Sequence, residues 1–116
     1  LAAEADSTLR AAVAFAPAAM NWGWNAPLRA RLLEAARRTR VPTFVAQAEN
    51  DWHVGPTEAI PAAVRAGGGD AAGRLYPAVG HNANDGHGLM LLAPDLWQDD
   101  VFGLLDRHVR GARRSD

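Results

Sequence analysis

The chain has 116 residues, of which 48% are hydrophobic, and its formal net charge is -1. This length fits one small domain or part of a larger one, and the near-neutral charge argues against nucleic acid or an anionic membrane surface as a partner. No apolar run reaches the roughly 18 residues that a membrane-spanning helix requires. The chain has no cysteine, which excludes disulfides, thiolate metal sites and a cysteine nucleophile within these residues.

Strand-like and helix-like segments alternate along the chain. Residues 1–6 are rich in alanine and typical of the last turn of a helix, and they lead into a predicted strand near residues 10–16. Asn25 follows as the predicted N-cap of a helix that tolerates Pro27 in its first turn. A sequence that opens on the end of a helix predicts a fragment whose upstream structure is missing.

Two further strands and two further helices complete the pattern. Strands are predicted near residues 42–48 and 73–79, and Pro77 shortens the second or places it near an edge of the sheet. A short helix is predicted over 56–66, and an amphipathic helix over 94–110. The last helix has a predicted buried stripe and C-cap, formed by Trp97, Val101, Leu104, Leu105, His108 and Gly111.

The order of these elements predicts the fold class. Strands joined by helical crossovers run parallel, so we expect an α/β fold with three parallel strands that alternate with helices. The strands are apolar on both faces, and three helices cover two faces incompletely. We therefore expect an uncovered sheet edge that is open to self-association.

An acidic turn follows the most apolar of the predicted strands. Asp51 comes shortly after the run 42–48, and the helix-breaking or turn-forming residues Gly55 and Pro56 follow it. Catalytic residues collect at the carboxyl edge of a parallel sheet, so Asp51 is a candidate catalytic acid. The alternative is that Asp51 caps the next helix or closes an Asx turn.

His81 and His87 lie in the predicted loop after the last strand, residues 80–88. An aspartate after one parallel strand and a histidine after the next can meet at one edge, where the carboxylate orients the imidazole. The order acid then histidine is that of the α/β-hydrolases, whose nucleophile precedes both on a G-x-S-x-G turn. The chain lacks this motif, because its two serines, Ser7 and Ser115, do not follow a strand.

Large aromatic side chains lie near the carboxyl ends of the first two predicted strands. Trp22 and Trp24 come after the first strand together with Asn21, and Trp52 follows the candidate acid. Aromatic side chains at this edge supply apolar area for a substrate pocket. We predict Asn21, Trp22 and Trp52 as pocket residues, and the alternative is that the tryptophans cover the local core.

Several segments carry a family resemblance, namely FAPAAMNW, VPTFVAQAENDW, RLYPAVG and DGHGLML, followed by Trp97 and DDVFGLLDRHV, and they span about residues 2–109. Together they resemble the C-terminal half of the dienelactone hydrolase family of α/β-hydrolases. The resemblance implies a Ser or Cys nucleophile upstream of Leu1, with an oxyanion hole of backbone N–H groups near it, and no cofactor. It implies hydrolysis of small carboxylic esters or lactones with Asp51 as the acid, and a peptidase or amidase of the same fold is the closest rival.

The resemblance leaves two candidates for the base. His81 matches the pattern in which Gly-His comes directly after the last strand, whereas Gly86-His87 matches relatives with a longer loop. Gly86 and Gly88 flank His87 and permit a sharp turn of the backbone there. We predict His87 as the base and keep His81 as the alternate.

Two hypotheses from other classes remain open. The loop holds side chains of the types that bind metals, namely His81, Asn82, Asn84, Asp85 and His87. The chain is also open to interpretation as a non-catalytic half-domain that binds a partner through an uncovered sheet edge. Stoichiometric zinc in the purified chain would favour the first, and a gene without a nucleophile motif would favour the second.

Overall fold

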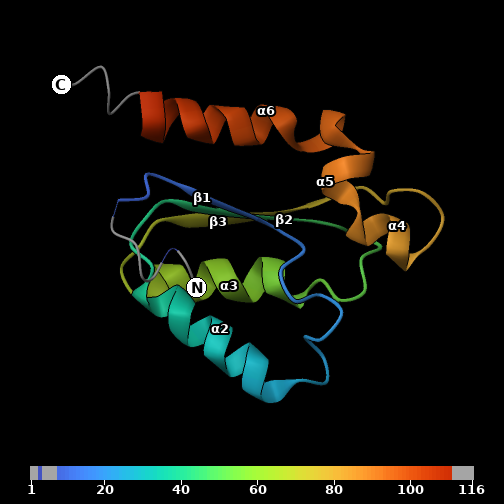
Figure 1. The fold of residues 1–116 in the computed structure, drawn as a ribbon, viewed down its shortest axis with the longest axis horizontal. Helices are drawn as coiled ribbons and strands as arrows, with labels where there is room; N and C mark the ends of the chain where they lie inside the picture. Colours follow the sequence, from blue (N-terminus) through green and yellow to red (C-terminus); the bar gives the residue numbers. More distant parts are fainter. Residues whose placement is uncertain (1–2, 4–7, 111–116) are drawn as a thin grey trace.

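Three parallel strands form the centre of the protein (Figure 1). The computed structural model describes residue 3 and residues 8–110. The sheet order is β1-β2-β3, and both neighbouring pairs are parallel. The strands have the bounds Ala12–Phe15 (β1), Thr43–Ala48 (β2) and Ala71–Tyr76 (β3). The predicted α/β class, an open sheet of three parallel strands alternating with helices, is confirmed.

The bounds of β3 differ from the predicted range. β3 begins at Ala71, because the backbone N–H of Thr43 donates to the carbonyl oxygen of Asp70 at 2.9 Å and aligns the two strands there. β3 ends at Tyr76, directly before a proline that has no N–H to donate. The predicted range 73–79 is therefore wrong at both ends, and only β2 pairs with this strand among the described residues.

Helices lie on both faces of the sheet. Two of them lie on one face, and the longest helix after β3 lies on the other (Figure 1). Two short helices come before that longer helix, and a π-helical turn follows it. The bounds are Ala26–Arg38 (α2), Gly55–Ala66 (α3), Ala83–His87 (α4), Leu89–Leu92 (α5), Pro94–Leu105 (α6) and Asp106–Arg110 (η1).

Each face of the sheet has its own core. Against α6 the core contains large side chains such as Phe44, Tyr76 and Leu104, and the ring of Phe15 packs edge-on against that of Trp97 at 4.8 Å. Against α2 and α3 the core contains smaller side chains, namely Ala36, Ala63, Val64 and Ala71. Small residues allow these two helices to approach the sheet and each other closely.

Pro61 lies inside α3, although proline normally interrupts a helix. It has no N–H to donate to the carbonyl group four residues earlier, which belongs to Thr57. This carbonyl oxygen faces Gly73 of β3, where a β-carbon would come within 2.1 Å of it. The glycine thus permits a close approach between β3 and the part of α3 in which a helical hydrogen bond is missing.

The ends of the other helices agree with the sequence in part. The Asn25 side chain caps α2 by accepting a hydrogen bond from the backbone N–H of Leu28 at 3.1 Å, as predicted. The predicted helix 94–110 is divided into α6 and the π-helical turn η1. His108 lies in that turn and is only half-buried, so it is not a core residue of the predicted stripe.

The segment 80–88 is not the continuous loop predicted, because it contains α4. The Asn82 side chain caps α4 and accepts a hydrogen bond from the backbone N–H of Asp85 at 2.9 Å. In the described part of the chain, no helix is long and apolar enough to cross a membrane. Apart from residue 3, the predicted helix end at residues 1–6 lies outside the described residues, as do Ser7, Gly111 and Ser115.

Candidate active site

The carboxylate of Asp51 is buried in the turn that follows β2. Its side chain is 0% exposed, and three donors surround it. Oδ1 accepts from the backbone N–H of Trp52 at 2.6 Å and lies 2.9 Å from Nδ1 of His87, and Oδ2 accepts from the amide of Gln47 at 2.9 Å. The N-cap of α3 is Val54, without a side-chain hydrogen bond, so Asp51 does not cap that helix.

His87 is the last residue of α4 and contacts the candidate acid. Its Nδ1 lies 2.9 Å from Oδ1 of Asp51, and its side chain is 37% exposed. The carboxyl ends of the neighbouring parallel strands β2 and β3 therefore bring together an acid and an imidazole, as the sequence predicted. An imidazole held by a buried carboxylate at Nδ1 leaves Nε2 as the ring nitrogen for proton transfer.

His81 occupies a different position. It is exposed, and its backbone N–H donates to Oδ2 of Asp85 at 2.8 Å. Of the two candidate histidines, the structure thus places His87 against Asp51 and leaves His81 on the outer part of the segment 80–88. The assignment of His87 as the base stays a prediction, and its contact with Asp51 is the kind that orients a catalytic imidazole.

Asn50 joins the turn after β2 to the segment after β3. Its amide nitrogen donates to the carbonyl oxygens of Val79 (2.8 Å) and Asn82 (3.0 Å), and its Oδ1 accepts from the backbone N–H of Val79 (2.9 Å). Gly86 lies so close to this residue that a β-carbon would come within 2.5 Å of Asn50 Oδ1. Asn50 therefore fixes the turn that carries Asp51 against α4, the helix that ends at His87.

Sequence reasoning missed both Gln47 and Asn50. Gln47 lies in the middle of a strand whose residues are all buried, and an uncharged polar side chain in such a strand needs hydrogen-bond partners. That mismatch is a signal that the sequence contained. Asn50 stands directly before Asp51 in a turn, where asparagine is common, and its long-range partners leave no local pattern.

The predicted pocket residues are spread over different environments. Trp52 is 50% exposed beside the acid, whereas Trp22 is 5% exposed and is buried against Gly55. Trp22 therefore contributes to the core beneath this edge. Asn21 is half-buried in the turn after β1, where its carbonyl oxygen accepts from the backbone N–H groups of Trp24 and Asn25.

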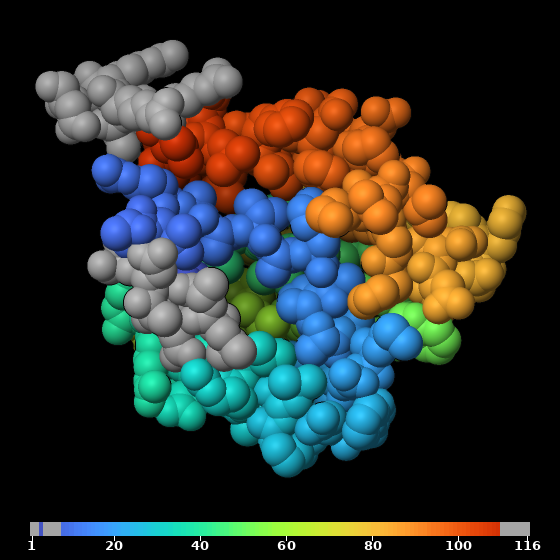
Figure 2. All heavy atoms as spheres, in the orientation of Figure 1, coloured from blue at the N-terminus to red at the C-terminus, as the bar shows by residue number. Residues whose placement is uncertain are grey.

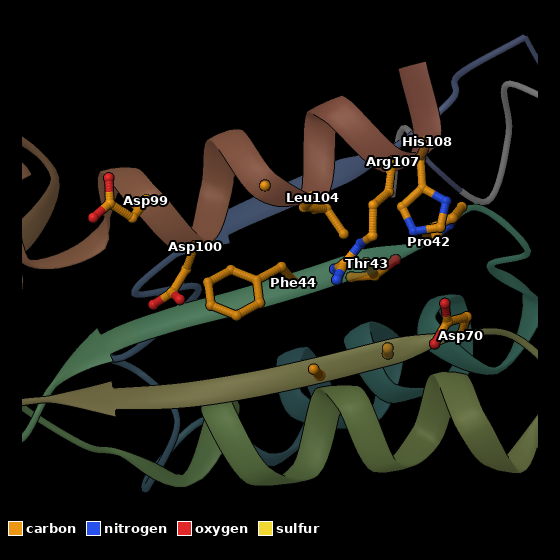
Figure 3. A pocket seen from close by; sticks show the side chains of 12 residues that line it. Pro42, Thr43, Phe44, Asp70, Asp99, Asp100, Leu104, Arg107 and His108 are labelled. Carbon is orange, nitrogen blue, oxygen red and sulfur yellow. The ribbon is translucent and has the colours of Figure 1, made fainter. Parts of the chain in front are cut away.

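The end of the molecule that carries α4 and α5 is visible in Figure 2 as gold and orange residues. Three cavities are formed by described residues, and none of the five predicted site residues lines them. One of these cavities, about 280 Å³, lies between α6 and the sheet and is lined by residues such as Thr43, Phe44 and Arg107 (Figure 3). It lies toward the amino ends of β2 and β3, and so away from the acid–histidine pair.

The side chains proposed as metal ligands do not converge. Asp85 accepts a hydrogen bond from the backbone of His81, Asn82 caps α4, and His87 faces Asp51. Within residues 3 and 8–110, no group of three or more His, Asp or Glu side chains is placed to hold a metal ion. The described residues therefore give the metal-site hypothesis no support.

A comparison of the chain with protein-family models, with curated proteins and with solved structures found no match.

Proposed function

We propose that this chain carries the acid and the base of a nucleophile–His–Asp triad in an α/β-hydrolase fold of the dienelactone hydrolase type. The substrates would be small carboxylic esters or lactones, with Asp51 as the acid and His87 as the base. The resemblance implies a serine or cysteine nucleophile in a segment upstream of Leu1, and the described residues include neither residue type. No metal or other cofactor takes part in this scheme.

One observation carries the proposal: Nδ1 of His87 lies 2.9 Å from Oδ1 of a fully buried Asp51 side chain. Burying a carboxylate costs free energy unless hydrogen bonds or an opposite charge compensate for its lost hydration. An ordinary ion pair on the surface would not bury its carboxylate in this way. Both residues follow the carboxyl ends of neighbouring parallel strands, the acid before the histidine in the chain, which is the order of α/β-hydrolases. The open sheet with helices on both faces supports the same fold.

The proposed reaction needs only one proton carrier. Nε2 of His87 would take the proton of the nucleophile as its oxygen or sulfur attacks the substrate carbonyl carbon. The same proton would pass from Nε2 to the leaving alkoxide as the C–O bond breaks and the acyl-enzyme forms. Water would then repeat the sequence and release the acid. Asp51 would keep the second ring proton on Nδ1 and stabilise the imidazolium between these steps.

The test uses a polypeptide that includes the residues encoded upstream of Leu1. A fluorophosphonate probe, which labels activated serines, should label it outside residues 8–110, and a thiol-directed probe covers the case of a cysteine. Hydrolysis of p-nitrophenyl acetate should fall on the order of a thousandfold or more in His87→Ala, as for loss of a triad member. His81→Ala is the matched control and should retain most of the rate.

Three outcomes would contradict all or part of the proposal. An inactive His81→Ala variant beside a near-normal His87→Ala variant would reverse the assignment of the base while leaving Asp51 as the acid. A polypeptide that neither reacts with the probes nor hydrolyses the ester would instead favour the non-catalytic half-domain. The 116-residue chain alone should hydrolyse the ester no faster than free imidazole, and a burst of acyl-enzyme on Ser7 or Ser115 would show that the nucleophile lies within the chain.

A further inference from the structure

We propose that Gln47 is a positioning residue for the acid–base pair: its amide group holds the Asp51 carboxylate in the one orientation in which Oδ1 faces His87. The inference rests on the proposed function for its catalytic consequence. Its structural basis is a closed set of hydrogen bonds that links β2, the turn after it and the first turn of α3.

Gln47 is fully buried, at 0% exposure. An amide buried without partners would cost free energy, so a glutamine in the centre of a parallel sheet needs a hydrogen bond for each of its polar positions. Gln47 has four such bonds, which is the full capacity of a side-chain amide. Every donor and acceptor position of this buried amide is therefore satisfied.

The four bonds also determine which way the amide points. Oε1 accepts from the backbone N–H (3.1 Å) and the hydroxyl (2.7 Å) of Thr57, and Nε2 donates to Oδ2 of Asp51 (2.9 Å) and the carbonyl oxygen of His53 (2.8 Å). A rotated amide would place its oxygen against a carboxylate and a carbonyl, and its N–H groups against a backbone donor. Only one orientation is therefore compatible with the surroundings.

This orientation defines the position of the carboxylate. Gln47 binds Oδ2, so Oδ1 is left for the backbone N–H of Trp52 and for Nδ1 of His87. Because the Asp51 side chain is 0% exposed, water cannot replace a donor that is lost. Without Gln47 the carboxylate would lose the one side-chain donor that Oδ2 has among the described residues, and it could rotate about its Cβ–Cγ bond. Thr57 extends the same support to the start of α3.

The experiment measures the tautomer of His87 by ¹⁵N NMR of the imidazole in the 116-residue chain at neutral pH. The unmodified chain should carry the proton on Nδ1, facing Asp51. In Gln47→Met, which has a similar length and no amide, the ratio of the Nδ1–H to the Nε2–H form should fall about tenfold, as expected for loss of a hydrogen bond to a charged group. In the longer, active polypeptide the same substitution should lower kcat about tenfold and leave KM unchanged.

Tyr76→Phe provides the matched control. It removes a hydroxyl that donates to Oδ2 of Asp100 at 2.5 Å on the α6 face, and so destabilises the protein without touching the acid–base pair. Its tautomer ratio should equal that of the unmodified chain. Thr57→Val removes only one of the two donors to Oε1 and should shift the ratio in the same direction by a smaller factor.

An unchanged tautomer ratio in a folded Gln47→Met chain would overturn the proposal, whatever the activity. If Gln47→Met does not give a cooperative melt, Thr57→Val decides: an unchanged ratio there overturns the proposal too. An equal shift in Tyr76→Phe would also overturn it, since the effect would then follow general destabilisation. If the probes label nothing, the hydrolase proposal fails, but the tautomer measurement on the 116-residue chain still tests the role of Gln47. A failure of one proposal is therefore distinguishable from a failure of the other.

Discussion

The acid and the base of the candidate site are held in different ways. Asp51 is held by its own part of the chain: Trp52 is its neighbour, and Gln47 lies four residues before it. Gln47 in turn binds His53 and Thr57. Except for His87, all the partners of Asp51 and Gln47 therefore lie within ten residues of them along the chain. The side chain of this acid is fully buried.

His87 depends instead on contacts between distant segments. Asn50 binds Val79 and Asn82, which are 29 and 32 residues away in the chain, and His87 itself is 36 residues from Asp51. Its imidazole is 37% exposed. Asp51 is thus preorganised by local structure, whereas His87 is placed by the packing of the segment after β3 on the turn after β2. A buried acid and a partly exposed base suit a triad, because the base must meet a nucleophile on its outer side.

The largest expected effect on the rate comes from a substitution of Asp51. In the longer polypeptide, Asp51→Asn should lower kcat for p-nitrophenyl acetate on the order of 10⁴-fold, because an amide donor toward Nδ1 favours the wrong imidazole tautomer. Asp85→Asn is the matched control, since Asp85 binds the backbone of His81 and not the imidazole of His87. A loss of equal size in both variants would show that the rate reflects general disturbance of this edge.

A substitution at Gly86 should disturb the packing that places His87. A β-carbon at this position would lie 2.5 Å from Oδ1 and 2.7 Å from the backbone carbonyl carbon of Asn50, so Gly86→Ala should destabilise the protein by about 1–3 kcal/mol through overpacking. Gly103→Ala is the control: apart from its own helix, no described residue has an atom within 4 Å of the added β-carbon, and alanine in the helix should stabilise by about 0.5–1 kcal/mol. Urea denaturation measures both, and equal midpoints would contradict the close packing on Asn50.

A milder change should separate the two sides. Asn50→Ala removes three hydrogen bonds to the segment after β3 and should cost about 1–2 kcal/mol, since the backbone groups of Val79 lose their partner. Amide hydrogen exchange should rise in α4 and stay unchanged at Asp51 and Trp52. Asn84→Ala, at an exposed position in the same helix, is the control. Faster exchange on both sides of the site would show that the acid is not held independently.

The smallest effect concerns a region outside the pair. Burial, together with the hydrogen bond to Asp100, raises the pKa of Tyr76 well above its ordinary value near 10. The folded state therefore keeps the phenol proton more tightly than the unfolded state, so this contribution to stability is complete below about pH 10 and is lost as the pH rises further. Tyr76 is the one tyrosine of the chain, so tyrosinate absorbance reports it alone.

Tyr76→Phe should remove this part of the alkaline destabilisation, which thermal melts between about pH 9 and pH 11 would detect. The His87 signals should be unaffected in the same pH range. A tyrosinate titration near pH 10 in the folded chain would contradict the burial of this phenol against Asp100.

Sequence and tertiary structure determined different parts of this protein. The apolar runs, the Asn25 cap and the turn at Asp51 were sufficient to predict the parallel α/β sheet and the acid at its carboxyl edge. These features depend on neighbouring residues, because strand periodicity and turn chemistry act over a few positions. The same local patterns misplaced β3, whose start depends on its pairing with β2.

Only the tertiary structure decided which partners the polar side chains have. The sequence allowed either His81 or His87 to reach Asp51, and nothing near Gln47 or Asn50 in the chain showed what their amides bind. Those choices depend on how the segment after β3 packs on the turn after β2, across 29 to 36 residues of chain. Hydrogen bonds are directional and short, so a shift of one residue in that packing would exchange the partners, and no local pattern encodes it.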